Sequence, residues 1–151
     1  MATGIDRSDE AILALLREDG RMSFREMSAR LDLSETTIRS RIRRLEQSGI
    51  MRVVARVDLK LTGFPFTALV GLKIRGRAVE DVGADLAGIS EVISILAVIG
   101  RSDLEIQIIA KTLEQLDELI YGLIARIEGI ASIESAIASK VRKYEQPWGQ
   151  F

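Results

Sequence analysis

Apolar positions in the first third of the chain recur every three or four residues, a spacing that predicts amphipathic helices. Three such helices are expected, over residues of about 6–17, 24–31 and 35–48. Asp6 or Ser8 can cap the first helix, and Ser23 with Glu26 has the spacing of a capping box at the start of the second. Gly49 follows the third helix in the position of a left-handed C-terminal cap.

A valine-rich stretch from Ile50 to Leu59 comes next and is expected to form a strand. Three helices followed by a short strand or hairpin describe a winged helix-turn-helix. The segment Thr62 to Pro65 carries Gly and Pro and is expected to be a hinge. The sequence therefore predicts a DNA-binding domain over residues 1–60, a hinge over 61–65 and a second domain over 66–151.

The pattern of the second domain alternates between the periods of strands and helices. Strands are expected over 66–74, 92–99, 104–110 and 133–141, and helices over 78–87 and from 112 to about 127. The order β-α-β-β-α-β predicts a ferredoxin-like domain with an antiparallel sheet, so the fold class is α+β.

Apolar residues in the second of these strands point to both sides. Val92, Leu96 and Val98 are expected on one face, and the other face is expected to carry Ile93, Ile95, Ala97 and Ile99. Two helices can cover only one face of a four-stranded sheet, so we expect self-association through the other face. The alternative is that a few exposed aliphatic side chains are ordinary surface.

The third helix has the composition of a helix that enters a DNA major groove. Thr36, Ser40 and Arg43 lie opposite its apolar side, and short polar side chains with arginines suit contact with base edges and phosphates. Between Thr36 and Arg56 the chain has six arginines and one acidic residue, although its formal net charge is −1. Contacts with double-stranded DNA are expected from Ser34, Thr36, Thr37, Arg39, Ser40, Arg43, Arg44 and Arg52. The alternative is that this charged face is only solvated surface.

Composition removes several classes of function. The chain has no cysteine and no histidine, which excludes disulfides, a zinc site of the usual Cys/His type, and Ser–His or Cys–His catalysis. No phosphate-binding glycine motif is present, so we expect no enzyme activity, no catalytic residue, no metal and no cofactor. No signal peptide or bilayer-length apolar run is present, which favours a cytoplasmic protein without a membrane partner.

From Ile5 to about Lys143 the chain resembles the Lrp/AsnC family of feast-famine transcription regulators. The resemblance lies in IDRSDEAILALLREDGRMS at the start, LSETTIRSRIRRLEQSGI at the third helix, and GRSD at Gly100 to Asp103. It implies a winged helix-turn-helix followed by a βαββαβ regulatory domain. It also implies dimers formed through the sheets, often assembled into tetramers or octamers, with an amino-acid effector bound between dimers near the turn.

The effector site implied by this resemblance comprises Gly100, Arg101, Ser102, Asp103 and Ser135. Gly100 and Asp103 match the turn of the family, and Ser135 stands where a hydroxyl residue is frequent, whereas Ser102 replaces a common aromatic residue. From chemistry alone, Asp103 could hold an α-ammonium group and Arg101 a carboxylate. The alternative is that these residues are simply a good hairpin turn.

These observations predict a transcriptional regulator whose oligomeric state or operator affinity responds to a small effector. The alternative is an architectural protein that compacts DNA without an effector, and preference for an operator over random DNA would separate the two. The third candidate function, a small enzyme of amino-acid metabolism, is the least supported of the three.

Overall fold

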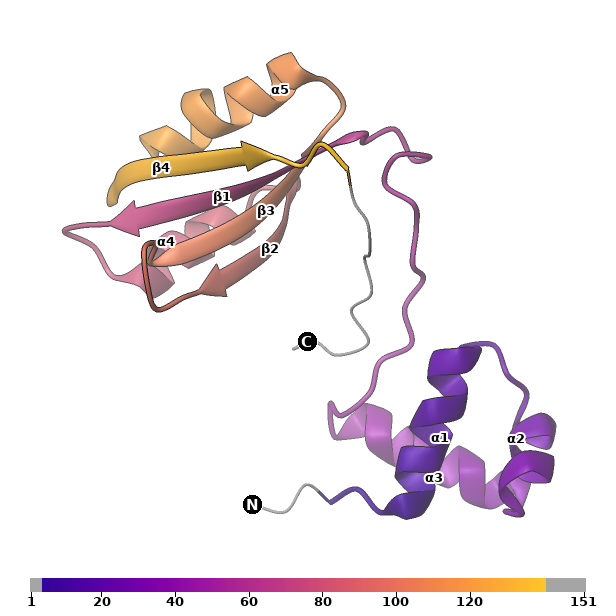
Figure 1. Ribbon diagram of the computed structural model, residues 1–151. Helices are drawn as coiled ribbons and strands as arrows, with labels where there is room; N and C mark the ends of the chain where they lie inside the picture. The colour runs from indigo at the N-terminus through magenta and orange to yellow at the C-terminus, as the bar shows by residue number, and fades with distance from the viewer. Residues whose placement is uncertain (1–3, 141–151) are drawn as a thin grey trace. The chain divides into compact units, whose positions relative to one another are not determined.

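The structure is a computed structural model that describes residues 4–140 of the 151-residue chain. The described residues form two compact units, one of residues 4–56 and one of residues 57–140 (Figure 1). Each unit has its own hydrophobic core. Among these residues, no helix combines the length and the apolar character needed to cross a membrane.

The first unit consists of the three expected helices. They are α1 (Arg7–Glu18), α2 (Phe24–Leu31) and α3 (Glu35–Gln47). Each helix begins after a residue whose side chain accepts a hydrogen bond from a free backbone amide, namely Asp6, Ser23 and Ser34. Their apolar stripes meet in a core of Ile12, Met22, Met27, Ile38, Ile42, Leu45 and Met51. The spacing of apolar residues thus predicted these helices correctly.

The strand expected from Ile50 to Leu59 is absent, and this prediction was wrong. Residues 51–58 have no regular secondary structure, and the side chains of Val53 and Val54 are 53% and 67% exposed. A strand forms only when its backbone groups pair with another strand, whatever its composition. Within residues 4–140, every strand belongs to a single sheet in the second unit, and none pairs with this segment.

The second unit is a four-stranded antiparallel sheet with two helical segments, as the alternating pattern predicted. Its strands are β1 (Phe66–Ile74), β2 (Val92–Ala97), β3 (Leu104–Ala110) and β4 (Ile130–Ile137). They lie in the order β2-β3-β1-β4, which is the order of a ferredoxin-like domain. β4 begins at Ile130 rather than at Ile133, because Gly129 adopts a φ of 95° and lets the chain turn at once into the strand. The expected end of this strand, Val141, lies outside the described residues.

Both helical segments cover the same face of the sheet (Figure 1). The first is α4 (Val79–Ala87). The second was expected to be one α-helix, but it consists of α5 (Leu113–Asp117), a π-helical turn η1 (Glu118–Leu123) and a 3₁₀ turn η2 (Ile124–Arg126). Gly122 lies within the π turn and has low helix propensity, and the Glu118 carboxylate packs where a Cβ of residue 122 would be.

The faces of β2 differ from the prediction. A bulge between Val92 and Ser94 inserts Ile93 as an extra residue, so Val92 and Ile95 both pack against the core on the helix-bearing face. Strict alternation had placed these two side chains on opposite faces. The uncovered face is mixed rather than a continuous apolar run, because polar residues of β1, β3 and β4 also lie on it. Its register positions include Thr67, Leu69, Lys73, Leu96, Glu105, Gln107, Glu134 and Ala136.

Candidate nucleic-acid interface and effector turn

The helix α3 presents two chemically different sides. Ile38, Ile42 and Leu45 are buried in the core of the first unit. On the opposite side, Thr36, Ser40 and Arg43 are exposed, as the helical projection predicted. The packing of the apolar stripe therefore fixes which polar side chains this helix offers to solvent.

An open hollow of about 610 Å³ lies beside this exposed side. It is lined by Asp6, Thr36, Thr37, Ser40, Arg41 and Arg44. Four of these residues are predicted DNA contacts, namely Thr36, Thr37, Ser40 and Arg44, and one carboxylate comes from the cap of α1. The hollow therefore combines hydroxyl groups, guanidinium groups and an acidic group on one surface.

Hydroxyl groups at the start of α3 are held together. The Ser34 Oγ atom accepts a hydrogen bond from the Thr37 amide at 3.1 Å, which caps the helix. The same atom lies 2.8 Å from Thr36 Oγ1 and 2.7 Å from Thr37 Oγ1. Of the predicted contact residues, Ser34 therefore has a structural role that orders its two neighbours.

Arginines of the predicted interface differ in their surroundings. The Arg39 guanidinium lies 5.0 Å from the centre of the Phe24 ring, a cation–π contact between α3 and α2. Arg52 is exposed in the segment after α3. Arg43 is exposed, and no other described side chain holds its guanidinium. Arg43 is therefore the member of this group whose charge is most available to a ligand.

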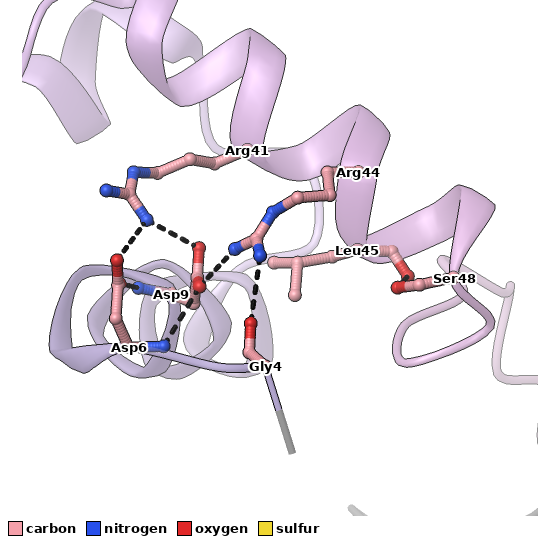
Figure 2. A network of polar contacts seen from close by, with 7 residues as sticks. All are labelled: Gly4, Asp6, Asp9, Arg41, Arg44, Leu45 and Ser48. Atoms are coloured by element: carbon pink, nitrogen blue, oxygen red, sulfur yellow. Dashed lines mark hydrogen bonds and ion pairs between the residues drawn. The ribbon is translucent and has the colours of Figure 1, made fainter. Parts of the chain in front are cut away.

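Arg44 and Arg41 are held by the start of α1 (Figure 2). Arg41 Nη1 donates to Asp6 Oδ2 at 2.7 Å and to Asp9 Oδ1 at 2.9 Å. Arg44 Nη2 forms an ion pair with Asp9, and its Nη1 donates to the Gly4 carbonyl at 2.8 Å. Asp6 and Asp9 also form a reciprocal capping box, in which each carboxylate accepts from the backbone amide of the other residue.

Asp9 is a fully buried carboxylate, with 0% of its surface exposed. Burial by itself raises the pKa of Asp9, but the hydrogen bonds from Arg44, the Asp6 amide and Arg41 outweigh it and lower the pKa to about 2. The pKa of Asp6 is also lowered, chiefly by the hydrogen bond from the Asp9 amide and then by Arg41. Both groups are therefore charged at neutral pH, and the two arginines neutralise them.

Sequence reasoning missed this network. It treated Asp6 only as a possible cap, left Asp9 and Arg41 without a role, and assigned Arg44 to DNA. A signal was present, because two acids three residues apart and two arginines three residues apart each share one face of a helix. The sequence does not show that these two helix faces are in contact in the fold.

The turn from Gly100 to Asp103 joins β2 to β3 and contacts β1. The Ile74 amide donates to Asp103 Oδ2 at 2.8 Å, and Lys73 Nζ donates to Asp103 Oδ1 at 2.9 Å. These two bonds, the backbone bond first, lower the pKa of Asp103. Both oxygens of the proposed ammonium-binding group thus already have a partner in the chain, and Lys73 is a neighbour that sequence reasoning did not identify.

The remaining turn residues divide between buried and exposed positions. Ser102 is only 5% exposed and packs over Gly71, where a Cβ would overlap Ser102 Oγ. Arg101 is exposed and lies 3.2 Å from the Glu134 carboxylate on β4. Gly71 and Glu134 pair in the sheet, so the turn rests on the uncovered face of β1 and β4.

Ser135 is not brought to this turn. It pairs with Val70, whose side chain lies in the core, and its Oγ is 3.4 Å from the Tyr121 hydroxyl of η1. Ser135 therefore faces the helical side of the sheet, whereas Ser102 and Glu134 lie on the other face. Within residues 4–140 there is also no group of three or more acidic, His or Cys residues that could hold a metal ion.

Comparison with known proteins identifies both units. Residues 5–50 match a family described as winged helix-turn-helix DNA-binding, and residues 67–148 match the Lrp/AsnC ligand binding domain. A relative in Pyrococcus horikoshii, described as an uncharacterized HTH-type transcriptional regulator, is 36% identical over 93% of this chain and 89% of its own length. The HTH-type transcriptional regulator FL11 of the same organism is 29% identical over 95% of each chain.

Solved structures share the same architecture over nearly the whole chain. A transcriptional regulator from Neisseria meningitidis, in complex with L-Met, superimposes with a TM-score of 0.88 and 24% identity, and the match covers 96% of both chains. AsnC of E. coli gives a TM-score of 0.83 with 22% identity, covering 95% of this chain and 97% of that one. At these identities the likeness concerns the fold.

Proposed function

This chain belongs to the Lrp/AsnC family of DNA-binding transcriptional regulators, and we propose that it binds operator DNA through the exposed side of α3 and adjusts that binding to an amino-acid effector. One observation carries the DNA-binding part of this proposal. The hydroxyl groups and the available Arg43 project from a helix whose opposite side is locked into a core. A rigid helix with short polar side chains can approach base edges closely, and a long cationic side chain can reach a guanine edge or a phosphate.

The effector part rests on the turn from Gly100 to Asp103. Here an exposed arginine, an anchored carboxylate and a lysine gather at one end of the uncovered sheet face. A zwitterionic amino acid needs an anionic group for its ammonium and a cationic group for its carboxylate. In our proposal the ammonium replaces Lys73 Nζ at Asp103, and Arg101 leaves Glu134 to bind the carboxylate. The L-Met complex of the Neisseria regulator supports an amino acid as the ligand class.

Self-association is the third part of the proposal. Leu69 and Leu96 are 59% and 56% exposed on the face of the sheet that no helix of residues 4–140 covers. We propose that two chains pair through this face, and that dimers assemble into tetramers or octamers with the effector between them. An effector at such an interface couples ligand binding to assembly, and assembly sets the spacing of the DNA-reading helices.

The DNA-binding part is tested by comparing a fragment of the chain's own promoter region with random DNA of the same length at physiological salt. A regulator binds the specific fragment ~10³-fold or more tightly. Equal affinity for both fragments would instead favour the alternative of an architectural protein that compacts DNA.

The effector part is tested by thermal unfolding in the presence of each of the twenty amino acids, because a ligand bound only by the native state raises its stability. One or a few amino acids should raise the melting temperature and change DNA affinity. Asp103→Asn keeps an acceptor for the Ile74 amide but removes the charge, so it should abolish both effects and leave ligand-free DNA affinity nearly unchanged. If no amino acid alters melting temperature, oligomer size or DNA affinity, the effector part is wrong.

A further inference from the structure

The ion-pair network between α1 and α3 lies on the surface that α3 offers to DNA. The hollow beside this helix is lined by Thr36, Thr37 and Ser40 together with Asp6, Arg41 and Arg44. We propose that Asp6 and Asp9 are specificity-determining residues, which hold Arg41 and Arg44 away from the phosphate backbone and so weaken binding to nonspecific DNA. This inference rests on the proposed DNA-binding face.

Both arginines form hydrogen bonds within this network. Arg41 Nη1 contacts a carboxylate oxygen of each aspartate, at 2.7 Å and 2.9 Å. Arg44 divides its two terminal nitrogens between Asp9 and the Gly4 carbonyl. Hydrogen bonds between a guanidinium and a carboxylate are charge-assisted and strong, so a phosphate competes with a carboxylate that already neutralises each arginine.

The carboxylates cannot turn aside to make room. Asp6 Oδ1 accepts from the Asp9 amide at 2.9 Å, and Asp9 Oδ2 accepts from the Asp6 amide at 3.1 Å. Rotating either carboxylate would leave an amide of the first turn of α1 without its partner. Asp9 is also fully buried, so water does not compete for its arginine contacts.

The net charge of this cluster determines how it affects DNA binding. Two arginines and two aspartates make a neutral cluster, so this wall of the hollow adds no attraction for phosphate. Nonspecific affinity depends on the number of phosphates that a protein neutralises. An α3 surface with all its arginines available would bind any duplex more tightly, whereas this one leaves discrimination to contacts with base edges.

Asp6→Asn tests the proposal in the full chain. Asparagine is as good an N-cap as aspartate, and its side-chain oxygen can still accept from the Asp9 amide. The substitution gives the cluster a charge of plus one and leaves Arg41 with only Asp9. We expect affinity for random DNA to rise severalfold, and the slope of log K against log salt to steepen by about 0.9, the value for one further phosphate contact. The preference for the promoter fragment over random DNA should fall.

Three further variants test whether the effect depends on the position of the charge and on Arg41. Glu10→Gln removes the same charge from the same turn of α1, but Glu10 does not line the hollow, so it should change the salt slope much less. The double variant Asp6→Asn/Arg41→Gln removes the released arginine and should restore the wild-type slope. Asp6→Ser keeps a capping hydroxyl and is too short to bind Arg41, so it should reproduce Asp6→Asn even if that variant folds poorly.

The proposal is overturned if Asp6→Asn and Asp6→Ser leave random-DNA affinity and salt slope unchanged, or if Glu10→Gln produces the same increase. Failure of the wider DNA-binding proposal looks different, because the wild-type chain would then show no preference for its promoter fragment. Thermal unfolding of each variant reports separately on the stability of α1.

Discussion

Arg43 is the arginine on α3 whose guanidinium no other described side chain holds. We expect Arg43→Ala to reduce promoter affinity by ~1–3 kcal/mol if the side chain reads a base, with relaxed preference at that base pair. If it contacts a phosphate, the loss should be equal for all sequences, and the salt dependence should become shallower by about 0.9. Gel-shift titrations at several salt concentrations measure both, with the exposed Arg126 of the second unit, replaced by Ala, as the control. Unchanged binding by Arg43→Ala would contradict the assigned face.

The lowered pKa of Asp9 predicts how the free energy of unfolding changes at acidic pH. Its pKa is lowered from 3.8 to about 2 in the folded chain, so its contribution is fully present above the unfolded pKa and is lost as pH falls through the folded one. That contribution is about 2 kcal/mol at most. The free energy of unfolding should therefore decrease between about pH 4 and pH 2, and Asp9→Asn should make this decrease smaller. Urea unfolding at a series of pH values measures it, and an equal slope in the variant would show that Asp9 is not ion-paired.

At the scale of elements, Gly71 sets how the turn from 100 to 103 packs on β1. Ser102 Oγ occupies the place that a Cβ of residue 71 would need. We expect Gly71→Ala to destabilise the second unit by ~1–3 kcal/mol, the usual cost of overpacking a buried contact. Adding Ser102→Ala should recover most of that loss, because the oxygen that clashes is removed. Chemical unfolding of the four members of this double-mutant cycle gives the coupling, and additive losses would contradict the contact.

The same pair explains the residue types at this turn. Gly71 leaves space for one small side chain from the turn, and Ser102 fills it with 5% exposure. Asp103 then anchors the turn to the Ile74 amide and to Lys73. An aromatic residue, which the resemblance implies is common at this position, would have to point elsewhere. In the proposed effector site, specificity is therefore expected from groups around the turn rather than from Ser102, which is buried.

For the whole molecule, the uncovered face of the sheet predicts the assembly. We expect Leu69→Glu to shift the chain towards monomer, because it places a charge in the middle of the proposed dimer interface beside the existing acidic residues of that face. Leu123→Glu is the matched control, because Leu123 is exposed to a similar extent, 47%, on η1, which covers the other face. Light scattering at micromolar concentration measures both masses. A monomeric wild-type chain, or dissociation by the control alone, would contradict this interface.

The segment from 51 to 58 shows that a composition typical of a strand is not enough to form one. Its valines are exposed and it has no strand partner within residues 4–140, although its composition favours a strand. Local propensity determines which secondary structure a segment favours, whereas hydrogen-bonding partners determine whether a strand forms. The helices of the first unit differ in this respect, because their backbone bonds are satisfied within each helix.

Most of the helices and strands of this protein follow from the local pattern of its residues. Apolar residues three or four apart specify α1, α2 and α3, and capping residues mark where each begins. Alternation specifies the strands and, through their order, the βαββαβ domain. These features are local, because the spacing of apolar residues within a helix or strand indicates which of its sides is buried. The exposed side of α3 follows from the same argument, since it is the opposite of the buried stripe.

Tertiary structure alone decided which side chains meet. Asp9 and Arg44 lie 35 residues apart, and nothing in the period of either helix states that their faces touch. The bulge at Ile93 reversed the assignment of Val92 relative to Ile95, because one inserted residue changes the face of every residue before it. Ser135 is separated from the turn for a related reason, since its partner in β1 points into the core. Pairing and packing between distant segments fix these contacts, and a one-dimensional pattern contains no record of them.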